Sequence, residues 1–182
     1  AHIPDNLDFN NAAAVPEVFM TAYDALFNHC ELRMGESALI HAAGSGVGTA
    51  AIQLAKSVGA VTFGTAGSQE KIDKAKELGL DLGVNYNTQQ FPEVIKDATN
   101  SRGVDVILDV IGAPYWVDNI SSLATKGRMV IVGTMGGATQ EVNLGALMQK
   151  RLTIKGTVLR SRSMPEKMTL NQQFVKHVLP LL

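Results

Sequence analysis

Short apolar runs alternate with amphipathic stretches along most of the chain. Runs of four to six mainly apolar residues predict six strands, which lie at 38–41, 60–63, 82–85, 104–109, 128–132 and 152–157. The stretches between them predict helices near 46–58, 69–78, 91–99, 115–124 and 144–150. Several strands are apolar almost throughout, which is typical of a parallel sheet that is covered on both faces.

This alternation predicts an α/β fold with a doubly wound, parallel, six-stranded sheet of the Rossmann type. Crossovers of this length form right-handed βαβ units, and the expected strand order is 3-2-1-4-5-6. A ligand is expected outside the carboxyl ends of the strands, where the order reverses. Residues 37–182 are interpreted as a dinucleotide-binding domain. Residues 1–36 stand outside the repeat, contain a helix predicted at about 12–27, and are interpreted as a segment leading to another domain.

A turn of small residues, "AGSGVG" at 43–48, follows the first predicted strand and opens the first helix. Against the pattern G-x-G-x-x-G, Ala43 and Ser45 occupy the first two glycine positions and Gly48 the last. Small side chains let the backbone approach a pyrophosphate, and a helix N-terminus offers it N–H groups and a favourable dipole. The position between strand and helix favours nucleotide binding. A turn that only packs the strand against the helix is the alternative.

The loop after the second predicted strand distinguishes between the two nicotinamide dinucleotides. Proteins that bind NAD usually carry an acid about 20 residues beyond the turn, where it holds the ribose 2′-hydroxyl. Gly67 lies nineteen residues past Gly48, and "TAGS" at 65–68 contains no acid. Ser68 and Lys71 are candidates to hold a 2′-phosphate instead, which favours NADPH. The alternative for Lys71 is a solvated charge on a helix, and Glu70 beside it argues against a phosphate unless it faces solvent.

Composition narrows the function classes. The 182 residues carry a formal net charge of −1 without a basic block, so neither nucleic-acid nor anionic membrane binding is expected. No apolar run reaches the roughly 18 residues of a membrane span. The single cysteine, Cys30, excludes a disulfide within the chain, so a protein of the reducing cytoplasm is expected. Cys30 and the four histidines do not have the spacing of metal ligands. The chain starts without methionine and is interpreted as part of a longer protein.

Other polar or aromatic residues in the predicted core are expected to be structural. His41 ends the first predicted strand and is expected to be a hydrogen-bonded core histidine. Asp109 ends the fourth strand, and its expected task is to accept hydrogen bonds from neighbouring backbone. Tyr115 and Trp116 begin a helix and are expected to pack. No Ser-His-Asp set or carboxylate pair for acid–base chemistry stands out.

Several linked segments resemble one known family. They are "AAAVPEVFMTAYDALF" at 12–27, "GESALIHAAGSGVGTAAIQLAKSVGA" at 35–60, "TAGSQEK" at 65–71, "LGVNYN" at 82–87, "GVDVILDVIG" at 103–112, "LATKGRMVIVGTMGG" at 123–137 and "GTVLRSR" at 156–162. In order and spacing the chain resembles the zinc-independent quinone oxidoreductases of the medium-chain dehydrogenase/reductase superfamily, the zeta-crystallin-like group. The resemblance implies reduction of quinones with NADPH, in one- or two-electron steps.

The resemblance also implies cofactor contacts at matching positions. The pyrophosphate contacts match Ser45, Gly46 and Val47, where Ser45 is also a candidate pocket residue. The 2′-phosphate contacts match Gly67, Lys71 and Tyr86. Contacts around the nicotinamide and its ribose match Thr21, Gly112, Gly133, Thr134, Met135 and a loop from Leu159 to Ser161.

The resemblance implies features beyond the cofactor site. Family members carry a catalytic domain before this region and further residues after it, so the chain is expected to be a C-terminally truncated cofactor-binding domain. Zinc-dependent members have a cysteine where Glu17 stands, so no metal is expected, although carboxylates can also bind zinc. The last strand, at 152–157, pairs with its copy in family dimers and predicts a homodimer. The alternative is an edge protected by Lys155 and neighbouring loops.

Two other functions remain open at this stage. An enoyl reductase of the fatty-acid or polyketide type shares the fold and cofactor, although "VDVILDVIG" at 104–112 favours the quinone group. A nucleotide-binding or structural module without turnover is the other alternative.

Overall fold

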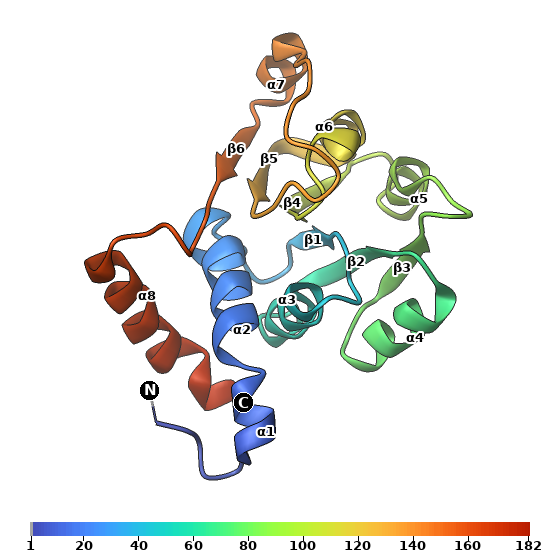
Figure 1. The fold of residues 1–182 in the computed structure, drawn as a ribbon. Coiled ribbons are helices and arrows are strands. Elements are labelled where there is room, and N and C mark those ends of the chain that lie inside the picture. Colours follow the sequence, from blue (N-terminus) through green and yellow to red (C-terminus); the bar gives the residue numbers. More distant parts are fainter. Residues whose placement is uncertain (1) are drawn as a thin grey trace.

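A parallel sheet of six strands forms the centre of the molecule. The computed structural model describes residues 2–182. The strands are β1 Ser37–Ile40, β2 Val61–Ala66, β3 Leu82–Asn85, β4 Val104–Asp109, β5 Leu123–Ile131 and β6 Thr153–Gly156. Their order is β3-β2-β1-β4-β5-β6, which confirms the predicted topology (Figure 1). The carboxyl ends of β1 and β4, where the order reverses, are therefore adjacent.

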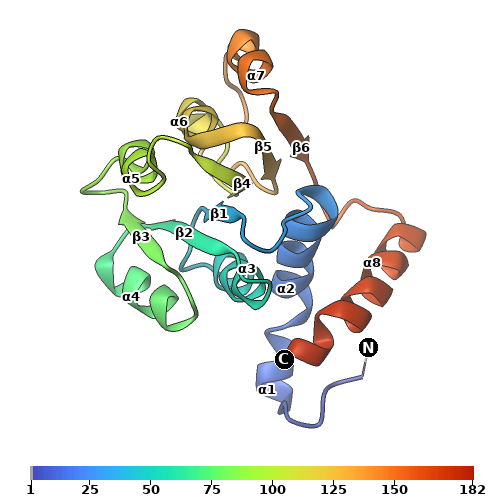
Figure 2. The ribbon, with the colours of Figure 1, turned by 180° about the vertical axis from the view of Figure 1, so that it is seen from behind.

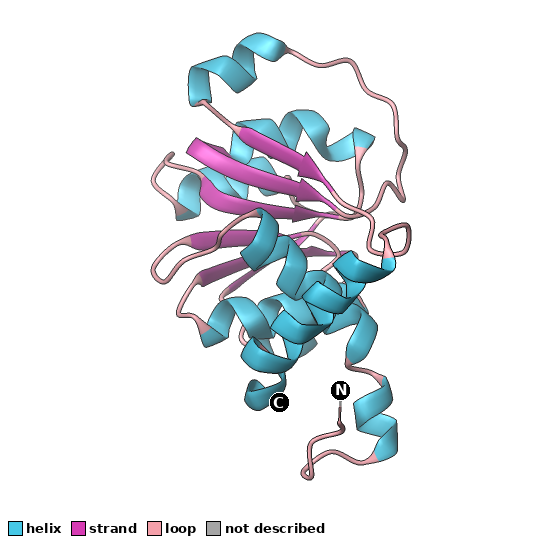
Figure 3. Ribbon diagram, turned by 90° about the vertical axis from the view of Figure 1, so that its left-hand side faces the viewer, coloured by secondary structure: helices cyan, strands magenta, loops and turns pink. Residues whose placement is uncertain are grey.

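Helices lie on both sides of this sheet (Figure 3). They are α1 Phe9–Ala13, α2 Pro16–Tyr23, α3 Gly46–Ser57, α4 Gln69–Glu77, α5 Phe91–Ala98, α6 Trp116–Ser122, α7 Leu144–Lys150 and α8 Met164–His177. Side chains of successive β1 residues alternate between two cores, because neighbouring residues of a strand point to opposite faces. Ala38 and Ile40 join the core with α2 and α3, whereas Leu39 joins the core with α5 and α6.

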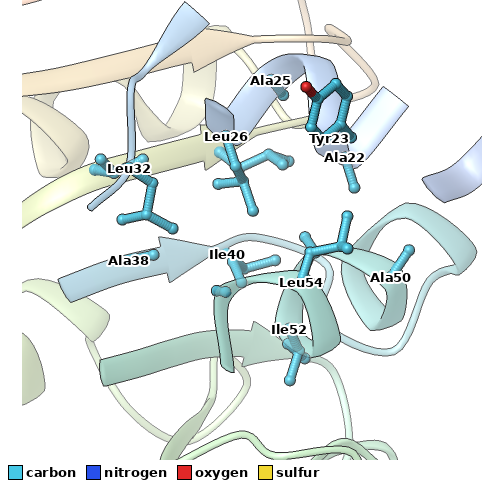
Figure 4. Close-up of a cluster of buried hydrophobic side chains, with 14 of the residues drawn as sticks. Ala22, Tyr23, Ala25, Leu26, Leu32, Ala38, Ile40, Ala50, Ile52 and Leu54 are labelled. Atoms are coloured by element: carbon cyan, nitrogen blue, oxygen red, sulfur yellow. The ribbon is translucent and has the colours of Figure 1, made fainter. Parts of the chain in front are cut away.

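The larger core joins residues far apart in the sequence (Figure 4). Leu26, Ile40 and Leu54 come from the segment after α2, from β1 and from α3, and all three are buried. The division at residue 36 stays a prediction, although α2 shares this core with the sheet.

The prediction of one continuous helix over 12–27 is wrong, because the chain forms two α-helices and a π-helix there. α1 ends at Ala13, and α2 begins at Pro16, where proline is tolerated in a first helical turn because it has no N–H to leave unpaired. After Tyr23 the chain widens into a π-helix, Asp24–His29. π-Turns are rare and often occur at functional sites.

The boundary between α6 and β5 also corrects the prediction. α6 ends at Ser122 rather than at 124, and Leu123 already pairs with Val104 in the sheet. The strand continues through the Lys126–Gly127 corner, where Lys126 has φ 64°, instead of beginning at 128. An irregular register between β4 and β5 absorbs the extra residues.

The last long helix, α8, was not predicted from the chain pattern. Ser163 and Glu166 form a reciprocal capping box at its start, so the sequence held a local signal for it. α8 packs beside α2, as the views from both sides show (Figures 1 and 2). Among residues 2–182, none of the helices has the length and apolar character needed to span a bilayer.

Candidate functional site

The small-residue turn lies at the carboxyl end of β1 and starts α3. Ser45 caps this helix, and its Oγ accepts a hydrogen bond from the Gly48 N–H at 3.1 Å. Its hydroxyl therefore has a structural role. Gly46 and Val47 occupy the first turn of α3, where N–H groups have no acceptor within the helix. The turn therefore has backbone donors that an anion could accept, and pyrophosphate binding there stays a prediction.

The loop after β2 gathers the four residues predicted to bind a 2′-phosphate. Ser68 caps α4, and its Oγ accepts a hydrogen bond from the Lys71 N–H at 3.3 Å. Tyr86, at the end of β3, covers Gly67 so closely that a Cβ there would lie 2.5 Å from the phenol oxygen. The Lys71 stem lies over Gly44, where an added Cβ would be 3.1 Å from the Lys71 Cβ. The loop and the turn after β1 therefore form one continuous surface.

Glu70 faces along its own helix. Its carboxylate lies 2.7 Å from the Lys74 ammonium, one turn further along α4. The hydrogen bond from Lys74 lowers the pKa of Glu70, with a smaller contribution from Lys71. Glu70 is therefore paired with Lys74, which removes the main objection to a phosphate site beside Lys71.

The ends of β4 and β5 are joined by close backbone contacts. Gly112 has φ 86°, and a Cβ on it would lie 2.6 Å from the Gly137 carbonyl oxygen and 3.1 Å from the Thr134 Cα. The Met135 N–H donates to the Val110 carbonyl at 3.2 Å. The structure thus places Gly112 beside the loop that begins at Gly133.

A cavity of about 360 Å³ opens between α2, the turn, the β5 loop and the segment after β6. Five predicted site residues line it: Thr21, Val47, Gly133, Met135 and Leu159. Gly112, Thr134 and Ser161 lie outside this lining, as do the four residues around the β2 loop. The predicted residues therefore occupy two regions, a cavity and a polar loop, on either side of the turn.

Two charged residues in the cavity lining were not singled out from the sequence, although Arg160 lies within the loop predicted at 159–161. Asp24 belongs to the π-helix and is buried, and its carboxylate pairs with Arg162 and with the His29 ring at 3.1 Å. Arg160 lies on the segment between β6 and α8, next to Leu159. No local pattern marks Asp24, because its partner Arg162 is 138 residues away. For Arg160 the signal was the family-like segment at 156–162.

His41 and Asp109 belong to a buried polar group behind the site. His41 is fully buried, and its ring nitrogens bond the Thr65 hydroxyl at 3.0 Å and the Asn119 carbonyl oxygen at 2.7 Å. Asp109 accepts hydrogen bonds from the Ile111 and Gly112 N–H groups at 2.7 and 3.1 Å. Both residues therefore have the structural partners predicted for them. Burial raises the pKa of Asp109, and its backbone donors oppose that rise.

The free energy of unfolding is expected to fall as the pH drops from 6.5 to 4. Burial lowers the pKa of His41 from 6.5 to about 4, so the unfolded chain takes up a proton in this window and the folded chain does not. The stabilisation is complete above pH 6.5, and about 3 kcal/mol of it is lost by pH 4. Urea unfolding across this range would measure the loss, and His41→Gln should flatten it. Equal slopes in both proteins would contradict this prediction.

Comparison with known proteins identifies the family. Residues 46–173 match the family model described as zinc-binding dehydrogenase. The chain belongs to this family. A human quinone oxidoreductase is 33% identical over 164 residues, which cover 90% of this chain and 49% of the relative. A highly reducing polyketide synthase of Fusarium pseudograminearum is 38% identical over 135 residues, 73% of this chain and 5% of the relative.

Solved structures of zinc-binding dehydrogenase relatives share the fold. An Escherichia coli quinone oxidoreductase, solved with NADPH, is 31% identical with a TM-score of 0.84 and is matched by 99% of this chain and 56% of its own. The CurK enoyl reductase is 30% identical with a TM-score of 0.82, over 97% of this chain and 53% of its own. The chain thus spans about half the length of the quinone oxidoreductases it matches.

The family description raises the question of zinc. Within residues 2–182, no three His, Cys, Asp or Glu side chains are grouped so that they could hold a metal ion. Glu17 lines the cavity, but its neighbour Asp24 is already paired with Arg162. Zinc sites in proteins use at least three protein ligands, so the donors in this part of the chain do not fit one. A metal-free reaction remains a prediction.

Proposed function

We propose that this chain is the NADPH-binding part of an oxidoreductase that reduces quinones by metal-free hydride or electron transfer. The observation that carries the proposal is the acid-free loop after β2, where Tyr86 covers Gly67 and the stem of Lys71 lies over Gly44 of the turn. An ammonium group suits a phosphate, whereas a 2′-hydroxyl is usually held by a carboxylate. The likeness to an E. coli quinone oxidoreductase solved with NADPH supports the same cofactor.

The two regions on either side of the turn suit the two halves of this cofactor. Gly46 and Val47 would hold the pyrophosphate on the N-terminus of α3, and Lys71 the 2′-phosphate. The ribose next to the nicotinamide would lie near Gly112. The nicotinamide would enter the cavity between Thr21 and Met135. Once bound, the nicotinamide supplies the hydride.

The protein's contribution is to orient the reactants and exclude water. Val18, Val110 and Val132 give the cavity apolar walls, which shield a planar ring from water. Gly133 lets the backbone approach the ring, and Thr21 offers a hydroxyl at the cavity wall. Holding two reactants in a reactive geometry accounts for much of an enzyme's rate. Hydride transfer itself needs no base, and the reduced quinone then takes up a proton that water can supply.

Reduction of an enoyl thioester with NADPH is the second candidate, because the chain resembles CurK enoyl reductase almost as closely. A module that binds the nucleotide without turnover is the third. Turnover of a quinone, compared with turnover of an enoyl thioester, separates the first two candidates. Absence of turnover with both, in a protein that binds NADPH, would favour the third.

The edge strand β6 is proposed as the dimer contact. Thr153, Lys155 and Gly156 are exposed and Ile154 is half-buried, and β6 pairs with β5 along one edge. The Lys155 ammonium donates to the His29 carbonyl at 2.8 Å, so this lysine points to its own chain rather than across the edge. That arrangement weakens the alternative in which Lys155 protects the edge.

Calorimetric titration of this chain with NADPH and with NADH tests the cofactor proposal. We expect NADPH to bind about 10-fold or more tightly, because a charge-assisted contact contributes about 1.5–3 kcal/mol. Equal affinities would remove the 2′-phosphate assignment. Binding of neither dinucleotide would overturn the proposal that this chain alone forms the cofactor site.

A further inference from the structure

A chain of buried hydrogen bonds crosses the sheet behind the proposed cofactor site. It starts at Thr65 near the end of β2, passes through His41 after β1 and Asn119 on α6, and ends at Asp109 on β4. All four residues are at most 1% exposed. None of them lines the cavity, so these hydrogen bonds can affect the site only by holding the loops that they join.

The acceptors along this chain fix the direction of each bond. Asp109 receives the Ile111 and Gly112 N–H groups, and these donors favour its carboxylate form. A carboxylate only accepts, so the Asn119 amide donates to it at 3.3 Å and turns its carbonyl oxygen towards His41. His41 must then donate from Nε2 at 2.7 Å and accept the Thr65 hydroxyl on Nδ1 at 3.0 Å.

Neighbouring contacts hold the ring in this orientation. The His41 imidazole meets the rings of Phe91 and Tyr115 edge to face, with centroids 5.0 and 4.8 Å away. Such contacts prefer a defined ring angle. Unsatisfied polar groups in a dry interior are costly, so the four members stabilise one another's positions.

Thr65 and Asp109, the two ends of this series of hydrogen bonds, lie under different parts of the proposed site. The Thr65 carbonyl accepts the Ala43 N–H at 2.8 Å, which ties the start of the turn to β2, two residues before Gly67. The Asp109 carboxylate holds the backbone of Ile111 and Gly112, beside Thr134 and near the place proposed for the ribose. The hydrogen-bonded chain therefore connects the 2′-phosphate loop with the nicotinamide side.

We propose that His41, as the neutral Nε2–H form, is a positioning residue that fixes the Asp109–Gly112 loop through Asn119. The inference builds on the proposed function, because it assigns this loop to the nicotinamide half of NADPH. His41 touches no reacting atom. Its effect is to keep the Gly112 backbone against the loop that begins at Gly133 and in register with the turn proposed to bind the pyrophosphate.

A matched pair of substitutions separates this role from packing. In His41→Gln the side-chain nitrogen can replace Nε2 and still donate to Asn119, whereas the shorter His41→Asn can replace only Nδ1 and face Thr65. We expect His41→Asn to speed hydrogen exchange at the Ile111 and Gly112 amides and to weaken NADPH binding about 10-fold. Binding of 2′,5′-ADP, which reaches only the adenosine side, should change less than about 2-fold.

His41→Gln should keep amide exchange and NADPH affinity near those of the unmodified chain. Identical behaviour of the two variants, or parallel loss of 2′,5′-ADP binding in His41→Asn, would overturn the inference. Failure of the unmodified chain to bind NADPH would count against the proposed function alone, since amide exchange still tests the loop.

Nitrogen-15 NMR of the unmodified chain needs no variant. It should show His41 as the Nε2–H tautomer. The Nδ1–H tautomer would reverse the direction of every hydrogen bond in this series and would also overturn the inference.

Discussion

Replacing Lys71 by alanine should weaken NADPH binding about 10- to 100-fold and leave NADH binding nearly unchanged. Lys71 lies in the first turn of α4, after the β2 loop, and its stem crosses Gly44 in the small-residue turn. Removal of the charge would leave the 2′-phosphate with the Ser68 and Tyr86 hydroxyls and backbone donors only. Isothermal titration with both dinucleotides measures the selectivity, which we expect to approach one.

Lys76→Ala is a suitable control for Lys71→Ala. Lys76 lies near the other end of α4, so its replacement removes the same charge from the protein without changing the loop. It should reduce NADPH affinity less than about 2-fold, through long-range electrostatics alone. If both variants lose affinity equally, the selectivity comes from net charge, and Lys71 has no specific contact. The loss in Lys71→Ala should also shrink as salt is raised, because exposed charges are screened.

Much of the fold could be predicted because its signals are local. Ser45 and Ser68 cap α3 and α4, and Gly79 ends α4 with φ 106°, all within a few residues of the helix that each one bounds. The order of the parallel strands then follows from the handedness and length of the crossovers. The errors occur where distant contacts decide the local structure. The π-helix at Asp24–His29 is held by Arg162, whose position no pattern near residue 24 reveals.

The residues of the candidate site differ in how clearly the sequence marks them. Glycines that must accept a close neighbour, such as Gly67 under Tyr86, are visible as small residues at strand ends. The buried partner of His41 is not visible, because Asn119 lies on a helix of mixed polarity 78 residues later. Nothing in its neighbours distinguishes it from an exposed polar residue. Sequence patterns therefore indicated the small residues at strand ends better than the buried polar residues behind them.

Gly48→Ala should destabilise the chain by about 3 kcal/mol and abolish detectable NADPH binding. A Cβ at this position would lie 2.3 Å from the Ala42 carbonyl oxygen and 2.9 Å from the Ala43 Cα. Both neighbours are backbone atoms, so the clash cannot be relieved by rotating a side chain. Either the turn or the start of α3 must move. Since both would hold the pyrophosphate, stability and binding should fall together, as measured by urea unfolding and calorimetry.

Gly46→Ala separates this steric effect from the general cost of changing a glycine in the turn. Its Cβ would lie 2.9 Å from a Val18 methyl group, which can rotate away, and alanine favours a helix at the start of α3. We expect a loss of less than about 1 kcal/mol in stability. Equal destabilisation by both substitutions would show that the turn tolerates no added methyl group anywhere. Gly48, the last glycine of the pattern, would then have no special role. If Gly48→Ala instead lowers the free energy of unfolding by about 2 kcal/mol more than Gly46→Ala, Gly48 is the point where α3 packs directly on the backbone after β1.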